Sequence, residues 1–375
     1  MAEGKVYTAI GLMSGTSMDG IDAALLATDG ERFVRPLGFL TVPYGDADRA
    51  LIRAAMGIKD AADPRAAAAT DLSTRLHIAA VRALLDQTGY DAEQVDVIGY
   101  HGQTLYHAPH DGITVQIGDG AAMAAALGID VINDFRSNDV KLGGQGAPLA
   151  PIYHWARACA ADTVELPCVV LNIGGVSNVT YIGAADEDLL AFDTGPGNAL
   201  MDDWMQTRTG ARYDADGQAA AKGRVIQPVL DQWLAHDYFD RKPPKSLDRD
   251  QWDISAFGRL LPDMAAVSVG DGAATLLAFS ADTIALSRRF MPREPKGWYV
   301  CGGGRHNTAL MAALRERLGS VQSVDALGWD GDATEAECFA YMAVRTLQNK
   351  PISFAGTTGV ERPTAGGVLH KGRTA

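Results

Sequence analysis

The sequence IGLMSGTSMDGIDAALL, residues Ile10–Leu26, decides the fold, because two apolar runs flank a turn of small polar residues. It predicts a hairpin of two strands, Val6–Leu12 and Ile21–Thr28. Small residues let the backbone of such a turn approach a ligand closely, and amide and hydroxyl groups there can donate to anionic oxygens. The stretch has no basic side chain, and Asp19 and Asp22 would repel a phosphate unless a cation lay between them. It therefore indicates nucleotide phosphates together with a divalent metal.

Length and charge limit the classes of protein to consider. A chain of 375 residues is too long for one compact core and predicts two domains. Its net charge of −13 makes nucleic acid and anionic membranes unexpected partners, so a bound anion has to be held locally. We expect no membrane span and no signal peptide, because no apolar run or basic N-terminal region of the required kind is evident. Four cysteines without CxxC spacing fit a reducing cytoplasm.

Strand and helix patterns alternate along the whole chain, which indicates an α/β architecture. The segment Leu142–Pro151, LGGQGAPLAP, is rich in glycine and proline and is the best candidate for a crossover between domains. We predict a first domain over residues 1–140, joined by the C-terminal segment 350–375, and a second over residues 141–349. Further expectations are a helix over Gln218–His236, a surface loop over Asp237–Asp253 and a frayed tail over Gly366–Ala375.

The second half of the chain opens as the first does. Strand Cys168–Asn172 runs into the tight turn Gly174–Asn178, and strand Val179–Ile182 returns, so the two halves predict an internal structural duplication. A third glycine-rich turn, Gly302–Gly304, follows the strand Trp298–Cys301. A single turn of this kind is more often structural than functional. The chain contains neither GxxxxGKS/T nor an early GxGxxG, which argues against a P-loop or a conventional dinucleotide-binding fold.

The motif Phe192–Asn198, FDTGPGN, carries a candidate catalytic carboxylate. Asp193 ends the predicted strand Leu189–Phe192, and a Gly-Pro turn and a helix follow. A carboxylate at the carboxyl end of a strand faces the ligand side of a sheet and can act as a general base. An aspartate here can equally tie down the turn in the manner of a helix N-cap. The spacing alone leaves both interpretations open.

Three histidines, His101, His107 and His110, lie close together in the sequence and raise the question of a metal site. One glycine-broken loop provides poor zinc geometry, and no acidic or thiol ligand completes the set. Two interpretations remain. His101, Gln103 and Thr104 contact a polar substrate, or they are simply polar residues of a loop.

Two further positions carry charge at the ends of predicted elements. Asp134 and Arg136 follow the strand Asp130–Asn133, where such a pair can hold a hydroxylated or anionic substrate or form a strand-end ion pair. Glu335 opens the last predicted helix, Ala333–Gln348, where an acidic residue also stabilises the helix dipole. Functional and structural roles stay open for all three residues.

Together these motifs resemble the anhydro-N-acetylmuramic acid kinase family, within the actin–hexokinase–sugar kinase superfamily. The resemblance covers nearly the whole chain, and the strings SGTSMDG and FDTGPGN are highly specific in combination. No motif departs from the family pattern. The matching segments are IGLMSGTSMDGID (Ile10–Asp22), GYHGQTLYHAP (Gly99–Pro109), TVQIGDG (Thr114–Gly120), NDFRSNDVKLGGQGAPLAP (Asn133–Pro151), LNIGGVSNVT (Leu171–Thr180), FDTGPGNALMD (Phe192–Asp202), CGGGRHN (Cys301–Asn307) and EAECFAYMA (Glu335–Ala343).

The resemblance implies an α/β protein with a two-domain actin/hexokinase-like (ribonuclease H-like) fold, in which mixed sheets flanked by helices surround a central cleft. Both domains would be actin-like, and the second would bind the nucleotide. The cofactor-binding residues implied are Ser14, Gly15, Thr16, Ser17, Met18, Asp19, Gly20, Ile21 and Asp22 in the first phosphate loop, Gly174, Gly175 and Asn178 in the second, and Gly302, Gly303 and Gly304 in an adenosine loop. The sugar would be lined by His101, Gln103, Thr104, Asp119, Asp134, Arg136 and Glu335.

The resemblance also implies the reaction. ATP and Mg²⁺ would be the cofactors, Asp19 and Asp22 would organise the metal, mainly through water, and Asp193 would be the catalytic base. Water deprotonated by Asp193 would open 1,6-anhydro-N-acetylmuramic acid at C1, and the released O6 would accept the γ-phosphoryl group, giving N-acetylmuramic acid 6-phosphate and ADP. This chemistry serves peptidoglycan recycling and amino-sugar catabolism. The family further implies a homodimer that binds the amino sugar and ATP, without nucleic acid or membrane.

Three other interpretations fit parts of the sequence. Another actin-like sugar kinase, acting on a free hydroxyl, needs only a base near that hydroxyl. A non-enzymatic actin-like filament or chaperone would hydrolyse ATP slowly without a sugar, but the polar cluster of His101, Gln103, Asp134 and Arg136 argues against it. A glycosidase that works without ATP would leave two phosphate-type loops unexplained.

Overall fold

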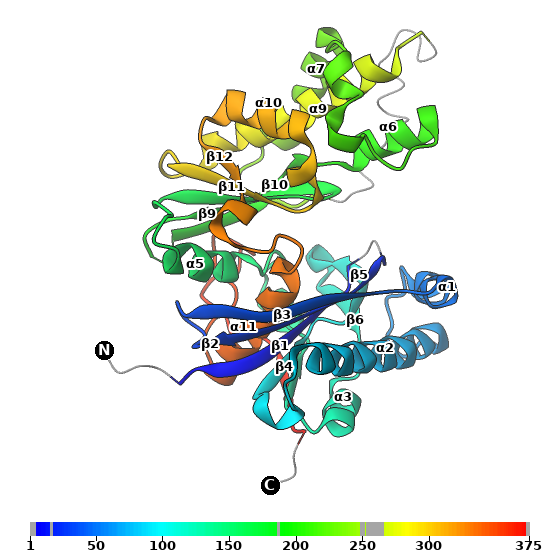
Figure 1. The fold of residues 1–375 in the computed structure, drawn as a ribbon, viewed down its shortest axis with the longest axis vertical. Helices are drawn as coiled ribbons and strands as arrows, with labels where there is room; N and C mark the ends of the chain where they lie inside the picture. The colour runs from blue at the N-terminus through cyan, green and yellow to red at the C-terminus, as the bar shows by residue number, and fades with distance from the viewer. Residues whose placement is uncertain (1–4, 16–17, 186–187, 248–251, 253–265, 373–375) are drawn as a thin grey trace. The chain divides into compact units, whose positions relative to one another are not determined.

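The computed structural model describes residues 5–15, 18–185, 188–247, 252 and 266–372 (Figure 1). Its contacts divide the chain into two compact units: unit 1 comprises Met1–Ala161 with Ala333–Ala375, and unit 2 comprises Asp162–Asp332. The chain therefore leaves unit 1 once and re-enters it once. The domain boundaries expected from the sequence, after residues 140 and 349, stay a prediction.

Unit 1 is built on a six-stranded mixed sheet in the order β13–β7–β4–β1–β2–β3. The predicted hairpin forms its centre, since β1 pairs antiparallel with β2, and β2 pairs antiparallel with β3. On the other side β1, β4 and β7 run parallel, and β13 closes the edge antiparallel to β7. The strands are β1 Tyr7–Met13, β2 Gly20–Thr28, β3 Val34–Pro43, β4 Val97–Tyr100, β7 Val131–Asn133 and β13 Val368–His370, and a separate hairpin comprises β5 Gln103–Ala108 and β6 Ile113–Ile117.

The two faces of this sheet are covered by different helices, because side chains along a strand alternate between faces. Ile10 and Leu12 of β1 are fully buried in a cluster with Leu84 of α2. The opposite face carries α11, which approaches so closely that a Cβ on Gly11 would lie 1.8 Å from the carbonyl oxygen of Ala336. The helices of unit 1 are α1 Asp46–Ala55, α2 Pro64–Thr88, α3 Gly120–Leu127, α4 Ser137–Lys141, α5 Pro151–Ala160 and α11 Thr334–Leu347.

Helices α5 and α11, next to the points where the chain leaves and re-enters unit 1, are joined by buried charge. Arg157 of α5 donates from Nη1 to Oε2 of Glu337 in α11 at 2.9 Å, and both residues are buried. Tyr153 donates to the same carboxylate oxygen and accepts from Arg157 at 2.8 Å. Removing one member of such a network leaves an uncompensated buried charge, which is strongly destabilising. The network therefore holds the two helices together within unit 1.

Unit 2 repeats the arrangement found at the centre of unit 1. Its five-stranded sheet has the order β10–β9–β8–β11–β12, in which β8, β9 and β10 are antiparallel neighbours and β8, β11 and β12 run parallel. The same order occurs in β3–β2–β1–β4–β7, which confirms the internal structural duplication. The strands are β8 Cys168–Ile173, β9 Val176–Ile182, β10 Leu189–Pro196, β11 Gly297–Cys301 and β12 Val321–Ser323.

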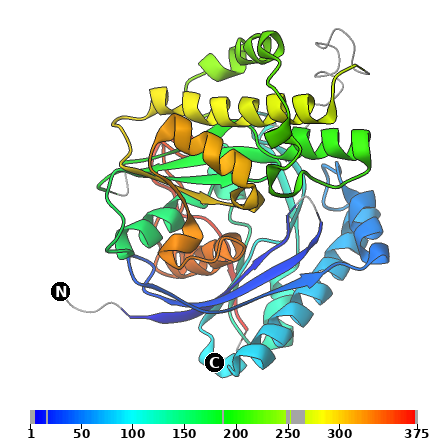
Figure 2. The same cartoon turned by 45° about the horizontal axis from the view of Figure 1, so that its top comes forward.

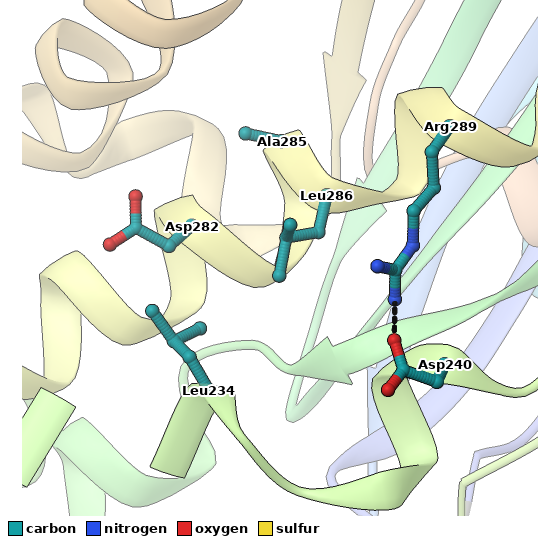
Figure 3. Close-up of a pocket in the computed structure, with 6 residues that line it drawn as sticks. All are labelled: Leu234, Asp240, Asp282, Ala285, Leu286 and Arg289. Atoms are coloured by element: carbon teal, nitrogen blue, oxygen red, sulfur yellow. Dashed lines mark ion pairs between the residues drawn. The ribbon is translucent and has the colours of Figure 1, made fainter. Parts of the chain in front are cut away.

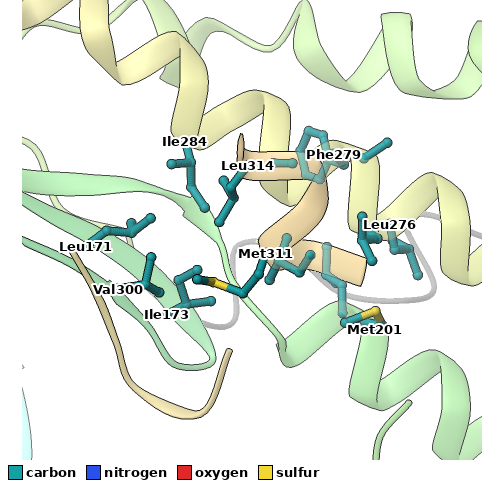
Figure 4. Packing of buried hydrophobic residues seen from close by; sticks show 14 of the residues in the cluster. Leu171, Ile173, Met201, Leu276, Phe279, Ile284, Val300, Met311 and Leu314 are labelled. Carbon is teal, nitrogen blue, oxygen red and sulfur yellow. The ribbon is translucent and has the colours of Figure 1, made fainter. Parts of the chain in front are cut away.

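The core of unit 2 lies between its sheet and a layer of helices (Figure 2). Val300 of β11 packs with Phe279 of α9 and Leu314 of α10 (Figure 4). Trp204 of α6 is fully buried, and its Nε1 donates to the carbonyl oxygen of Val269 at 2.9 Å, so its polar atom is satisfied inside the core. The helices of unit 2 are α6 Ala199–Thr209, α7 Gln227–Leu234, α9 Val269–Leu286 and α10 Thr308–Leu318.

One helix of unit 2 bears on the expectation that the chain has no membrane span. In the described part of the chain, one helical stretch is long and apolar enough to cross a membrane by length and composition. It is Val269–Phe290, which consists of α9 and the short 3-10 turn that follows it. In its most apolar window 67% is buried inside the structure. A buried core helix of a globular domain passes the same test, so this helix is weak support for a membrane span.

The predicted helix over Gln218–His236 is wrong. A Cβ on Gly223 would lie 1.9 Å from the carbonyl oxygen of Gly270, so the chain passes α9 in a close backbone contact that a continuous helix could not make. Helix α7 begins only at Gln227, with Pro228 in its first turn. Proline fits there because the first helical N–H groups have no partner within the helix.

Two more expectations about polar segments need correction. In the expected surface loop Asp237–Asp253, Tyr238, Phe239 and Leu247 are buried, and part of the segment lies outside the described residues. The tail is not frayed over its described part, because β13 pairs with β7 across three residue pairs. Both segments gain order from distant partners that their own sequence does not reveal.

The contact between β1 and α11 predicts a large cost for a single methyl group. In Gly11→Ala the new Cβ would meet backbone atoms of Ala336 and Ala340, at 1.8 and 2.5 Å. Overpacking of this kind lowers the free energy of unfolding by about 1–3 kcal/mol or more. Gly45→Ala is the control, because its Cβ would meet only the flexible carboxylate of Asp48, at 3.2 Å. Urea unfolding should show a much larger drop in midpoint for Gly11→Ala, and equal midpoints would contradict the packing.

Candidate active site

A compact hydrogen-bonded network at the end of β1 shapes the first glycine-rich turn. Ser14 is buried, its Oγ donates to Oε1 of Gln103 at 2.7 Å, and it lies 2.8 Å from the Tyr44 hydroxyl. Gln103 is also buried, and its Nε2 donates to the carbonyl oxygen of Gly15 at 3.2 Å. The fold thus brings Ser14 and Gln103 together across 89 positions of sequence, and Gln103 braces the turn. Tyr44, a third member of this network, was not predicted.

The rest of the turn offers backbone groups more than side chains. Met18 has a φ of 55°, and its N–H donates to the carbonyl oxygen of Gly15 at 3.1 Å, which closes the turn. The side chains of Met18 and Ile21 are buried in the core of unit 1, so their backbone is what a ligand could reach. The predicted loop residues Thr16 and Ser17 lie outside the described residues.

Asp19 and Asp22 flank the start of β2. Asp19 is exposed, whereas Asp22 is half-buried and accepts a hydrogen bond from Oγ1 of Thr41 at 2.6 Å. The charge of Asp22 also raises the pKa of Glu335. Neighbouring carboxylates fit a hard divalent cation that keeps part of its water shell. Over the described ranges there is no group of three or more acidic, histidine or cysteine side chains that could hold a metal ion.

Arg136 is held in place by a neutral histidine. Its Nε and Nη2 donate to Nε2 of His101 at 3.2 and 3.0 Å, and its Nη1 donates to the carbonyl oxygen of Gly146 at 2.7 Å. Nδ1 of His101 lies 2.9 Å from the carbonyl oxygen of Gly102 and therefore carries the ring proton. Burial lowers the pKa of His101 well below its ordinary value, and the charge of Arg136 lowers it further. Both ring nitrogens of His101 are thus engaged within unit 1.

Arg136 and Glu335 are electrostatically coupled. The surrounding protein raises the pKa of Glu335, the charge of Asp22 raises it further, and Arg136 lowers it. Burial in turn lowers the pKa of Arg136, and the charge of Glu335 opposes that effect. The Glu335 side chain, in the first turn of α11, keeps an exposed surface. A polar ligand could therefore reach this carboxylate.

Three other residues of the predicted sugar side have local partners. Thr104 accepts a side-chain amide hydrogen bond from β6 at 3.3 Å. Asp119 caps α3 by accepting from the N–H of Ala122 at 2.9 Å. Asp134, with a φ of 55°, accepts from the hydroxyl of Ser137. These contacts shape a hairpin, a helix end and a loop, while roles toward a substrate stay a prediction.

Unit 2 places Asp193 inside a strand rather than at its end. β10 continues to Pro196 with a bulge between Asp193 and Gly195, which corrects the strand end expected from the sequence. Oδ2 of Asp193 accepts from the N–H of Leu247 at 2.7 Å. Burial raises the pKa of Asp193 to about 6, while the Leu247 hydrogen bond and the charge of Lys245 oppose that rise. Such a carboxyl group is largely ionised at neutral pH and able to accept a proton.

The turn between β8 and β9 is tied to the segment that follows Asp193. The N–H of Asn198 donates to the carbonyl oxygen of Gly174 at 2.7 Å, and that of Gly197 donates to the carbonyl oxygen of Gly175 at 2.9 Å. A Cβ on Gly197 would lie 2.3 Å from the Gly174 carbonyl oxygen, so only glycine permits this approach. Asn198 is the N-cap residue of α6, which means that Asp193 does not cap that helix.

A cavity of about 520 Å³ adjoins this junction, and Asn198 and Gly303 both border it. Gly302 has a φ of 74°, and a Cβ there would lie 2.4 Å from Oδ1 of Asn172, which keeps the predicted adenosine loop tight against β8. The cavity therefore borders the third glycine-rich turn, and Asn198, which also lines it, is hydrogen-bonded to the second. Its lining residues are Asn198, Met201, Asp202, Tyr213, Asp214, Ala215, Asp216, Gly303, His306 and Asn307.

The structure adds one aromatic residue to the cavity and places the last predicted residues. Tyr213 lines the cavity, and 62% of its surface is exposed. Sequence reasoning missed it, although an aromatic residue within a polar stretch is a signal that could have indicated a binding residue. Gly304 packs its backbone against the side chain of Ile173. Asn178 faces Asp193 in the register of β9 and β10.

Two units with one repeated strand order, each with a glycine-rich turn after its first strand, define an actin/hexokinase-like α/β protein. Component A of (R)-2-hydroxyglutaryl-CoA dehydratase from Acidaminococcus fermentans has a similar fold, with a TM-score of 0.50 at 13% identity. The likeness covers 90% of this chain and 99% of that chain. The fold class expected from the sequence is confirmed.

Sequence comparison gives the family. A family model described as anhydro-N-acetylmuramic acid kinase matches residues 7–372. A relative of that name from Rhizorhabdus wittichii is 53% identical over 369 residues, covering 97% of this chain and 98% of its own. Another, from Rhodospirillum rubrum, is 50% identical over 376 residues, covering 100% of this chain and 96% of its own. The chain belongs to the anhydro-N-acetylmuramic acid kinase family.

The raised pKa of Asp193 predicts that this residue destabilises the fold at neutral pH. Its pKa rises from 3.8 to about 6, so folding favours the protonated carboxyl, and stability falls as the pH increases through 6. Asp193→Asn removes the charge and should raise the free energy of unfolding near pH 8 by up to about 3 kcal/mol, whereas the two proteins converge as the pH falls toward ~4. Urea unfolding across this range measures the gain. A gain independent of pH, or a loss near pH 8, would contradict an ionised buried carboxylate.

Proposed function

We propose that this protein is an ATP-dependent kinase that hydrolytically opens the anhydro ring of 1,6-anhydro-N-acetylmuramic acid and phosphorylates O6. The products are N-acetylmuramic acid 6-phosphate and ADP, as required for peptidoglycan recycling and amino-sugar catabolism. Family membership supports the substrate and the reaction. The structural observation that carries the proposal is the junction in unit 2, where backbone hydrogen bonds join the Gly174–Gly175 turn to Asn198, five residues after the half-buried Asp193 and at the edge of the cavity.

The nucleotide is proposed to use the cavity and the turn of unit 2. A volume of about 520 Å³ lies within the usual range of small-molecule sites. Gly303 would lie against the adenosine, and the exposed ring of Tyr213 offers a flat apolar face to the base. Amide groups of the Gly174–Gly175 turn would receive phosphate oxygens, and the Ser14–Gly15 turn of unit 1 is the second candidate for that role.

Magnesium is proposed to lie at Asp19 and Asp22, bound mainly through water. The two carboxylates supply hard oxygen donors, and a hydrated magnesium ion needs only one or two of them. When bound, the ion neutralises phosphate charge that the carboxylates would otherwise repel. Asp22 already accepts one hydrogen bond from Thr41, which fixes the orientation of its carboxylate.

Asp193 is the proposed general base. Its carboxylate takes a proton from water, the water oxygen forms a bond to C1, and the C1–O6 bond breaks. O6 then forms a bond to the γ-phosphorus while the bond to the ADP oxygen breaks. A pKa of about 6 suits this step, because Asp193 is mostly ionised at neutral pH and still basic enough to accept the proton.

The groups proposed for the sugar belong to unit 1. The guanidinium of Arg136 makes three donor contacts within unit 1 and has five N–H groups, so two remain for the lactyl carboxylate of the substrate. His101 is proposed to act through Arg136, because both of its ring nitrogens are engaged. Glu335 offers an exposed carboxylate to a sugar hydroxyl. Gln103, Thr104, Asp119 and Asp134 stay candidate contacts.

The wider setting is also part of the proposal. A net charge of −13 supports a protein without nucleic acid or anionic membrane as partner. Four cysteines without CxxC spacing support a reducing, cytoplasmic location. The family resemblance supports a homodimer.

The proposed base predicts a large and selective loss of activity. Asp193→Asn keeps the shape of the side chain but cannot accept the proton, and turnover should fall by about 10²–10⁴-fold while the affinity for ATP changes little. ADP formation that depends on added anhydro-sugar measures the activity. Asp231→Asn, an exposed aspartate of the same unit, is the matched control and should keep wild-type turnover. Near wild-type turnover of Asp193→Asn would exclude its proposed role.

Ring opening distinguishes the proposed reaction from phosphorylation of a free hydroxyl. In ¹⁸O-labelled water, attack on C1 places the label at the anomeric position, where it can be detected by mass spectrometry if the product is analysed before anomeric exchange. The control for label that enters by anomeric exchange is the free sugar N-acetylmuramic acid, which has no anhydro ring, incubated under the same conditions. A phosphorylated product without label beyond this control indicates a kinase that acts on an existing hydroxyl.

A further inference from the structure

The residues Tyr238–Leu247, here called the strap, enclose Asp193 from outside its sheet. The N–H of Asp193 donates to the carbonyl oxygen of Lys245 at 3.1 Å, and the N–H of Leu247 donates to Oδ2 of Asp193 at 2.7 Å. The Tyr238 hydroxyl donates to the carbonyl oxygen of Asp193 at 2.7 Å. The backbone N–H, the backbone carbonyl and the carboxylate of Asp193 are thus all bonded to the strap. Asp193 cannot shift relative to the strap without breaking these bonds.

Lys245 fixes the C-terminal end of the strap. Its Nζ donates to the carbonyl oxygen of Tyr238 at 3.1 Å and lies 3.5 Å from that of Phe239. The ammonium group also lies over three aromatic rings, 4.6 Å from the centroid of Tyr238, 4.8 Å from that of Phe290 and 5.7 Å from that of Phe192. A desolvated cation against ring faces is attracted to them. These contacts close the strap into a loop, because Lys245 is bonded to Tyr238, and the hydroxyl of Tyr238 donates to Asp193.

The N-terminal end of the strap is anchored separately, by Arg289. Arg289, just beyond α9, pairs with the carboxylate of Asp240 at 2.9 Å and also donates to the carbonyl oxygen of Phe239 (Figure 3). Figure 3 shows this pair at one side of an open pocket that Leu234 and Asp282 also line. Of the charged residues that line the pocket, Asp240 pairs with Arg289, and Asp282 pairs with Arg317 of α10 at 2.5 Å. The arrangement is therefore a support for the strap.

We propose that Lys245 is a positioning residue for Asp193: its clamped ammonium group fixes the strap, and its positive charge favours the ionised form of the carboxylate that the strap holds. The proposal rests on the proposed role of Asp193 as the general base. It gives a half-buried lysine, in a segment whose sequence predicts a polar surface loop, a defined part in the reaction.

The charges around Asp193 agree with this assignment. Lys245 lowers the pKa of Asp193, and burial lowers the pKa of Lys245 itself to about 8. Arg289 and Arg241 lower the pKa of Lys245 further, whereas Asp240 and Asp193 raise it. The lysine is therefore charged over the range near pH 6 in which Asp193 ionises. Tyr238 stays neutral there, since burial and the charge of Asp193 raise its pKa.

The test is the pH profile of Lys245→Met, in which a side chain of similar length keeps the apolar packing but carries no charge. The acid limb of kcat/KM should move upward by about 0.5–1 pH unit, so that activity near pH 6 falls about two- to fivefold more than activity near pH 9, where Asp193 is ionised in both proteins. Lys222→Met, at an exposed lysine of the same unit, should leave the profile unchanged. A purely structural role for Lys245 would lower activity by one factor at every pH, and that result, or an unchanged profile, overturns the proposal.

A stability cycle tests the same coupling without using activity. Lys245→Met should lower the free energy of unfolding more in the wild-type background than in the Asp193→Asn background at neutral pH, and this difference should vanish as the pH falls below the range in which Asp193 ionises. Equal effects in both backgrounds overturn the coupling even if the lysine is needed for folding. Absence of sugar-dependent ADP formation in the wild-type protein would contradict the proposed function, whereas the cycle would still decide whether Lys245 supports the charge on Asp193.

Discussion

The carboxyl group of Asp193 is held where the surrounding protein excludes much of the water, and its role as the proposed base depends on its staying ionised there. Burial raises the pKa of this carboxyl group, as it does for acids in general, because the low-dielectric interior disfavours the charged form. One backbone N–H, from Leu247, and one nearby cation, Lys245, act in the opposite direction. Because these effects oppose each other, the carboxyl group of Asp193 is neither a strong acid nor permanently protonated. A carboxylate on an exposed loop would be a weaker base, and one without the Leu247 contact would be more easily protonated.

Unit 1 meets a similar requirement with the opposite charge. Arg136 is partly buried, and its guanidinium is oriented by the neutral Nε2 of His101 and by the carbonyl oxygen of Gly146 rather than by a contacting carboxylate. Neutral acceptors fix the direction of a cation without cancelling its charge, so the charge stays available to an anionic ligand. This only works while His101 is unprotonated, and its burial ensures that. In both units, therefore, much of the support for a charged side chain comes from backbone groups and neutral side chains.

The sequence predicted those features that depend on local chemistry. The hairpins after Ile10 and Cys168 follow from apolar runs around small residues, and the duplication follows from their recurrence. The strap did not follow, because its order depends on Asp193, about fifty residues earlier in the chain, and on the aromatic rings of two other segments, at Phe192 and Phe290. Nothing local distinguishes Lys245 from a surface lysine. The pairing of Ser14 with Gln103 and the edge strand β13 were missed or left open for the same reason, since each requires a partner far away in sequence.

The duplication explains the scaffold of this protein, whereas the proposed base lies in one of the two copies only. The third meander strand is β3 in unit 1 and β10 in unit 2; each has a register shift against its neighbouring strand, and the strap is bonded to β10. Two of the three bonds between the strap and Asp193 use backbone atoms of the strap, at Lys245 and Leu247, so they do not depend on the side chain at the residue between them. The side chains that matter are those that fix the path of that backbone. Tyr238 and Lys245 do so from opposite ends of the strap, and each contacts the other, which makes the geometry of the proposed base depend on a pair of residues that a search for catalytic motifs would pass over.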